Sequence, residues 1–138
     1  MTRTNARELA VRLVFAGEGS EYFWDEEYYK TLSEEDSTFK QFPDEKQAEY
    51  IKTLVCLVNE HLQEIDETIN RNSKAWSTGR ISSTALAVLR VAVCEMLFME
   101  DVPKASAINA AVEISKNFDE PETVSFVNGV LGSIARSL

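Results

Sequence analysis

The side chains best suited to catalysis or metal binding are few in this chain: one histidine, His61, and two cysteines, Cys56 and Cys94. A tetrahedral zinc site made from these three would still need a borrowed carboxylate. Cys56 and His61 are five residues apart, which on a helix points them to different faces and gives poor geometry for a nucleophile and its base. We therefore expect a solvent-exposed histidine, buried or half-buried free thiols, no metal and no catalytic residue.

The acidic residues are numerous, but their spacing is not typical of acid–base catalysis. Residues 26–27 and 34–35 are adjacent glutamate pairs in a charged, aromatic segment, so they predict a solvated face and no acid–base pair at a fixed separation. The chain also contains no Walker loop, no GxGxxG and no HExxH motif. We expect a protein that is not an enzyme and that needs no cofactor.

The overall charge limits how the chain could bind a nucleic acid. Lys and Arg number 14 against 23 Asp and Glu, which gives a net charge of −9. Proteins that bind nucleic acids broadly use basic surfaces that displace counterions. Any RNA-binding function would therefore rest on a local basic patch. Arg3 and Arg7 are four residues apart in the first predicted helix, so they share a face and could form that patch.

Length and composition predict a single globular domain over residues 1–138. The chain is 44% hydrophobic and 27% charged, which is ordinary for a soluble protein, and its length is enough to bury a core. The N-terminus carries charges where a signal peptide would be apolar. The most apolar window, 85–99, contains Arg90 and Glu95 and is shorter than the roughly 20 residues of a membrane span. We expect a cytoplasmic protein that does not enter a membrane.

Apolar residues recur at steps of three and four along most of the chain, and this spacing predicts helices. The segment 4–16 has one apolar stripe. The segment 44–70 predicts one long helix that lies along a partner helix. The segment 82–99 is apolar on nearly all sides, so it predicts a central helix, with Ser82 or Ser83 as its N-cap.

Two more helices are predicted in the C-terminal part. One opens at Pro103 and runs to about Phe118, and the last begins at Asp119, with Glu122 three residues on as in a capping box. The acidic, aromatic segment 18–44 allows a further short helix. No segment alternates as a strand does. The sequence therefore predicts an all-α fold, a compact bundle of about six or seven helices.

Two residues are unusual for the helices that contain them. Arg90 lies in the most apolar helix, and a buried guanidinium needs an acceptor, for which Glu113 on the following helix is the candidate. Gly129 lies inside the last helix, where glycine costs about 1 kcal/mol relative to alanine. Close helix packing or close approach of a ligand is expected to compensate.

Several short segments, in their order and spacing, resemble the NusB family. They are AVLRVAVCEML at 87–97, DVP at 101–103, AIN at 107–109, AVE at 111–113 and FVNGVL at 126–131. The N-terminal ARELA at 6–10 resembles the arginine-rich first helix of that family. The similarity is close over 82–131, weaker over 3–16 and not visible over 17–75.

The resemblance implies an all-α fold of two packed helical sub-bundles and a role in transcription antitermination on ribosomal RNA operons. Proteins of this family bind the boxA element of nascent RNA as a heterodimer with NusE, which is also a protein of the small ribosomal subunit. They act on the transcription elongation complex without cofactor or catalysis. We accordingly expect boxA-type RNA and NusE as partners.

The resemblance also implies roles for particular residues. Arg3 and Arg7 match arginines that face RNA phosphates. Phe126 matches a position near the RNA where a ring can stack on a base, and Glu122 matches an acidic position beside it. Phe15 matches an aromatic residue on the side that faces NusE. For Phe15 and Phe126, simple core packing stays an equal alternative.

The chain departs from the family pattern at four positions. Thr4 and Asn5 stand where the family usually has two more basic residues. Ala85 stands where an acidic residue is frequent and would complete a capping box, and Ala105 stands where a lysine is frequent. These differences predict a low affinity for boxA RNA in the absence of a partner.

Three alternatives stay open. A NusB-like helical adaptor could bind protein partners only, having lost RNA binding, and the net charge of −9 favours this alternative. RNA cytosine methyltransferases carry a NusB-like domain ahead of their catalytic domain, so an enzyme would require this chain to be a fragment. A helical homodimer could form along the apolar seam of residues 51–69.

Overall fold

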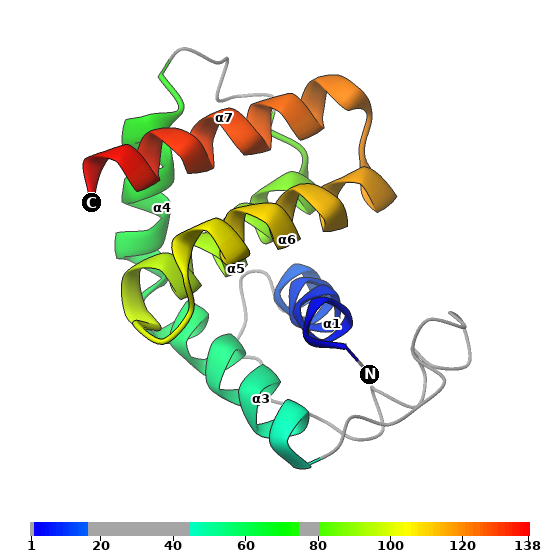
Figure 1. Cartoon of the computed structure of the whole chain (residues 1–138). Helices are drawn as coiled ribbons and strands as arrows, with labels where there is room; N and C mark the ends of the chain where they lie inside the picture. Colours follow the sequence, from blue (N-terminus) through cyan, green and yellow to red (C-terminus); the bar gives the residue numbers. More distant parts are fainter. Residues whose placement is uncertain (1, 17–44, 75–80) are drawn as a thin grey trace.

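The computed structural model describes residues 2–16, 45–74 and 81–138, which form six α-helices and no strand. The helices are α1 (Arg3–Ala16), α3 (Glu45–Glu60), α4 (Leu62–Asn72), α5 (Ser83–Phe98), α6 (Lys104–Phe118) and α7 (Pro121–Ser137), as Figure 1 shows. The all-α bundle predicted from the sequence is therefore confirmed. The short helix expected within 18–44 lies outside the described residues.

Helix α5 is the centre of the bundle. It packs against each of the other five described helices, and every residue from Ala87 to Met96 is buried. A helix covered on all sides has no face for water, which explains why this segment is apolar nearly all round. Each fully buried valine or leucine contributes about 1.5–3 kcal/mol, so the burial of α5 adds substantially to core stability.

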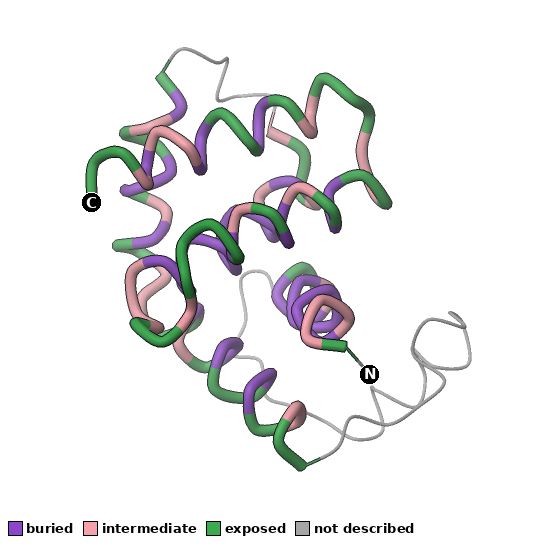
Figure 2. Tube along the Cα trace, in the orientation of Figure 1, coloured by how far each residue is buried: buried purple, intermediate pink, exposed green. Residues whose placement is uncertain are grey.

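The other helices form two groups around α5. Helices α1 and α3 pack on each other and on α5, while α4 and α7 pack on each other and on the same helix. Helix α6 contacts α5, α7 and α1, so it joins the two groups. In Figure 1 the first group lies below the second, and Figure 2 shows buried and exposed stretches alternating along α3 and α7. That alternation is expected for amphipathic helices with one face on a core.

The single long helix predicted over 44–70 is wrong, because the segment forms two helices. Helix α3 ends at Glu60, α4 begins at Leu62, and His61 between them has a non-helical backbone with φ −111° and ψ 22°. The His61 ring stacks on Phe98 at the end of α5, with ring centroids 4.0 Å apart. The break lets α4 turn away from α3 to pack on α7. His61 is thus half-buried and not the fully solvated residue we expected.

The apolar seam of 51–69 is used inside the monomer. Ile51, Val55 and Val58 of α3 are buried in the core, as are Ile65 and Ile69 of α4. The apolar spacing that predicted one long helix is therefore present in two shorter helices, which pack on different neighbours. These side chains are not available to a second copy, so a homodimer built on this seam has no support.

The start of α5 follows the prediction, and the start of α6 differs from it by one residue. Ser82 is the N-cap of α5, and its Oγ accepts a hydrogen bond of 3.1 Å from the backbone N–H of Ala85. Such a cap is worth about 1 kcal/mol. Helix α6 begins at Lys104, and Pro103 is its N-cap where we had placed the first helical residue.

The capping box predicted at Asp119 and Glu122 is wrong. Helix α7 begins at Pro121, and Asp119 lies at the C-terminal end of α6. The Asp119 carboxylate instead accepts hydrogen bonds from Ser82 Oγ, at 3.3 Å, and from Thr84 Oγ1, at 3.1 Å. These bonds fasten the junction of α6 and α7 to the start of α5. The N-cap of α7 is Glu120, so Glu122 does not lie three residues after the cap, and the Asp119 side chain makes a tertiary contact instead.

Candidate nucleic-acid interface

Two arginines of α1 line one pocket. Arg3 and Arg7 lie one turn apart on the same face, and they border a pocket of about 350 Å³. The other residues around this pocket come from α3, from the connection between α5 and α6, and from the start of α6. They are Tyr50, Met99, Asp101, Val102, Pro103 and Ser106. The shared face predicted for the two arginines is therefore present, opposite a mixed apolar and polar wall.

Arg7 is bonded to a buried carboxylate on α5. Its Nε donates hydrogen bonds to Glu95 Oε1, at 2.9 Å, and to Oε2, at 3.2 Å. Burial alone would lower the pKa of Arg7, but the hydrogen bond and negative charge of Glu95 outweigh it and raise the pKa above its usual value. The guanidinium is therefore always charged. Arg7 is 9% exposed, so little of its side chain is open to the pocket.

Tyr50 of α3 completes this buried cluster. Its hydroxyl donates a hydrogen bond of 2.7 Å to Glu95 Oε2. Burial, and then the charge of Glu95, raise the pKa of Tyr50 well above its usual 10.0, so the hydroxyl keeps the proton that it donates. Glu95 is 1% exposed and Tyr50 is 8% exposed. Arg7, Glu95 and Tyr50, called the buried triad below, thus join α1, α5 and α3.

Arg3 lies on the solvent side of this triad. Its guanidinium carbon is 3.8 Å from the centroid of the Tyr50 ring, a cation–π distance. Arg3 is half-buried, whereas Arg7 is buried. The two arginines therefore differ: Arg7 is buried and paired with Glu95, while the Arg3 guanidinium lies over the Tyr50 ring at the pocket wall.

The C-terminal half of α1 faces the end of α6. Asn117 Nδ2 donates a hydrogen bond of 3.0 Å to Glu8 Oε1, and the Arg12 guanidinium carbon is 5.3 Å from the Phe118 ring centroid. The chain then passes to the start of α7, where Glu122 lies. Helix α1 thus links the arginine pocket at its N-terminal end to the α6–α7 junction at its other end.

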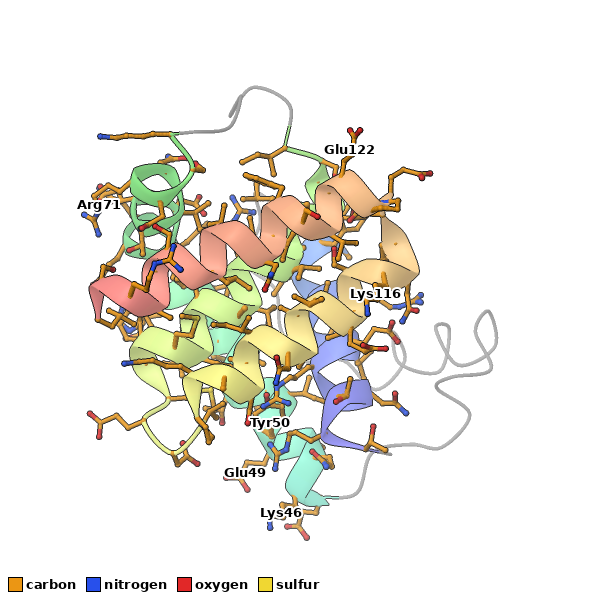
Figure 3. The ribbon with its side chains drawn as sticks, turned by 45° about the horizontal axis from the view of Figure 1, so that its top comes forward. Lys46, Glu49, Tyr50, Arg71, Lys116 and Glu122 are labelled. Atoms are coloured by element: carbon orange, nitrogen blue, oxygen red, sulfur yellow. The ribbon has the colours of Figure 1, made fainter. Side chains whose placement is uncertain are left out.

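The remaining predicted site residues lie elsewhere. Phe126 is 8% exposed and belongs to the core, so packing is the role that the structure shows for it. Glu122 is exposed, and Figure 3 shows it well away from Tyr50 and the arginine pocket. Phe15, at the end of α1, is 45% exposed, so core packing does not account for it.

The sequence reasoning missed Tyr50 and Glu95. Glu95 was read only as a charge that interrupts an apolar window. The signal was nevertheless present, because a carboxylate inside an all-round apolar helix needs a cation or hydrogen-bond donors. Nothing in the sequence shows that Arg7 and Tyr50 are those donors, since they are 88 and 45 residues away.

The predicted pair of Arg90 and Glu113 is wrong. Arg90 Nε and Nη2 donate to the two carboxylate oxygens of Asp66 on α4, at 2.9 and 3.0 Å. Glu113 is exposed and lies 3.7 Å from Lys116 of its own helix. Gly129 is also exposed, so close helix packing does not compensate for it as we had expected.

Within the described ranges, no group of three or more His, Cys, Asp or Glu residues could hold a metal ion. Cys94 is buried and Cys56 is exposed, both as free thiols, so the expectation of burial fails for Cys56. None of the helices described is long and apolar enough to cross a membrane.

The chain is similar in sequence to proteins of known family. The family model described as "NusB family" matches residues 4–136. Transcription antitermination protein NusB of Acetivibrio thermocellus is 38% identical over 136 residues, which cover 99% of this chain and 90% of that protein. The protein of the same name from Natranaerobius thermophilus is 33% identical over 140 residues, covering 100% of this chain and 97% of its own.

The fold is also similar to solved structures. A crystal structure of antitermination factors NusB and NusE in complex with dsRNA contains a chain with a TM-score of 0.79 and 26% identity. The match covers 99% of the present chain and 97% of that one. NusB of T. maritima gives a TM-score of 0.73 at 27% identity, covering 99% of this chain and 92% of its own.

Proposed function

Because this chain belongs to the NusB family, we propose that it is a transcription antitermination factor that binds boxA-type RNA of ribosomal RNA operons together with NusE. It would act in the cytoplasm on the transcription elongation complex, without catalysis. The observation that carries the proposal is the arginine pocket on α1, in a fold similar to a NusB solved with NusE and dsRNA.

The arginine pocket has the properties that an RNA backbone requires. Arg3 is a half-buried cation on the wall of an open pocket, and Arg7 lies one turn along the same helix with its charge paired to Glu95. The Asp101 carboxylate also lines the pocket, so Arg3 is the main phosphate contact proposed there. Phosphate contacts of this kind position a protein on its nucleic acid without reading the sequence. Glu122, exposed at the start of α7, and Phe126, which is 8% exposed, are the further proposed RNA contacts.

The charge of the remaining surface predicts that RNA binding depends on a partner. With a net charge of −9, the protein repels a polyanion everywhere except at local basic sites. Two arginines supply few of the phosphate contacts that strong binding needs. NusE would add contacts of its own, and Phe15, exposed at the end of α1, is the proposed residue on the side that binds it.

The test is the binding of labelled boxA-type RNA, with and without NusE, over a series of salt concentrations. We expect binding that weakens as salt rises and that is tighter with NusE. Arg3→Glu is expected to weaken binding about tenfold or more and to reduce the salt slope by about one. Arg71→Glu makes the same charge change on an exposed arginine of α4, away from the pocket (Figure 3), and should change binding little.

The alternative is a NusB-like adaptor that binds protein partners only. The engagement of Arg7 by Glu95 favours it, because part of the basic character of α1 is neutralised inside the fold. Two results together would establish this adaptor. A well-folded sample would bind no RNA with or without NusE, and it would bind NusE in a way that Phe15→Ala weakens. Equal RNA binding by Arg3→Glu and the wild type would instead move the RNA site away from α1.

A further inference from the structure

Tyr50 is the residue that joins the buried triad to Arg3. One face of its ring carries the Arg3 guanidinium, 3.8 Å from the centroid, while its hydroxyl is bonded to Glu95. No residue of α3 was expected to take part in binding, and the resemblance gives none a role. We propose that Tyr50 is a positioning residue for RNA binding, which holds Arg3 at the pocket wall in the orientation that meets a phosphate.

This inference rests on the proposed function, and its first support is the rigidity of the ring. Tyr50 is 8% exposed, and its hydroxyl makes a 2.7 Å bond to a carboxylate, which is a short charge-assisted hydrogen bond. The carboxylate is itself fixed by two contacts from Arg7 Nε. The ring therefore cannot move away from this position without breaking a buried hydrogen bond.

The second support is the position of Arg3 at the start of its helix. Arg3 is the first residue of α1, where the positive end of the helix dipole disfavours a cation. A long arginine side chain also has many rotamers, and ordering it costs entropy. The negative face of an aromatic ring offsets both effects. Tyr50 thus orders Arg3 before RNA binds, so the entropy cost of ordering this side chain does not reduce the RNA affinity.

The test is a double-mutant cycle measured by boxA-type RNA affinity in the presence of NusE. Tyr50→Leu removes the ring and is expected to weaken binding about fivefold. The same substitution in an Arg3→Ala background should cost little more, because the side chain that it orients is gone. Tyr50→Phe keeps the ring but loses the hydroxyl that fixes it, so its RNA affinity should lie between those of the wild type and Tyr50→Leu.

Ile69→Ala, which removes a buried side chain of α4, controls for the loss of stability and should leave RNA affinity unchanged. A role of Tyr50 that is only structural predicts a different pattern. Tyr50→Leu would then weaken RNA binding equally in both backgrounds, or not at all, and either result overturns the proposal.

A measurement without RNA separates this inference from the proposed function. Side-chain NMR resonances of Arg3 should carry a ring-current shift that disappears in Tyr50→Leu and persists in Tyr50→Phe. If RNA binds through Arg3 and the shift is absent, the positioning role is wrong while the function stands. If the shift is present and no RNA binds with or without NusE, the proposed function fails and the positioning role for RNA fails with it.

Discussion

Helix α5 carries two ionic contacts that lie in different regions of the molecule. Glu95 faces α1 and α3 and is 1% exposed. Arg90, five residues earlier and about 140° round the helix, faces α4 and pairs with Asp66, whose side chain is 34% exposed. One contact is therefore a closed interior cluster, and the other is open to water on one side.

The difference in burial decides what each contact does. Water cannot solvate a charge in the interior, so removing one partner leaves the other charge uncompensated. Water replaces the lost partner of a half-exposed pair, which makes such a pair weak. The buried triad therefore fixes α1 and α3 on α5, beneath the proposed RNA site, whereas the Arg90–Asp66 pair only assists the packing of α4.

The largest expected effect is that of Glu95→Ala. It leaves Arg7 buried without its carboxylate and deprives the Tyr50 hydroxyl of its acceptor. We expect the free energy of unfolding to fall by about 3–5 kcal/mol. Urea unfolding followed by circular dichroism measures this loss. An additional Arg7→Met substitution should recover part of it, because no lone charge then remains. A loss below about 1 kcal/mol would remove the distinction between the two contacts.

A smaller effect is expected at alkaline pH. Burial and the charge of Glu95 raise the pKa of the Cys94 thiol from 9.0 to about 12, and they raise that of Tyr50 above 10.0. The unfolded chain therefore releases these protons at lower pH than the folded chain does. The stability that they contribute is complete below about pH 9 and is lost as the pH rises toward 12. Each group adds a slope of up to about 1.4 kcal/mol per pH unit.

Urea unfolding between about pH 8 and pH 11 checks this dependence. Cys94→Ala and Tyr50→Phe should each flatten the decline. The slopes are the quantities to compare, because both substitutions also change the packing of the core. A decline that is identical in the wild type and both variants would place its source outside the region of the buried triad.

The smallest expected effect is that of Asp66→Ala. The Arg90 side chain that remains is only 11% exposed, but the Asp66 side of the pair is open to water, so the loss should be about 1–2 kcal/mol, below that of Glu95→Ala. Repeating the unfolding in about 1 M salt should shrink the difference from the wild type, because salt screens exposed charges. The loss caused by Glu95→Ala should hardly change with salt. Equal salt dependence in the two variants would contradict the contrast in burial.

Local patterns in the sequence were sufficient to predict most of the helices. Ser82 caps α5 as its residue type indicates, and the apolar segment after it became the central helix. The break at His61 was not predicted, because Ile51 to Ile69 keep a helical spacing across it. Stacking of His61 on Phe98, which is distant in sequence, accompanies the break, and periodicity contains no information about such a contact.

The sequence by itself determined the helical content, the central place of α5 and the shared face of Arg3 and Arg7. These follow from backbone hydrogen bonds and apolar spacing, which act between residues a few positions apart. Only the tertiary structure decided the partners of the charged residues. A charged residue in an apolar segment implies that it has a partner of opposite charge, but the sequence does not identify that partner. The packing of α1 and α3 places Arg7 and Tyr50 against Glu95, so that Arg7 is buried and Arg3 lies on the Tyr50 ring, although both arginines line the pocket.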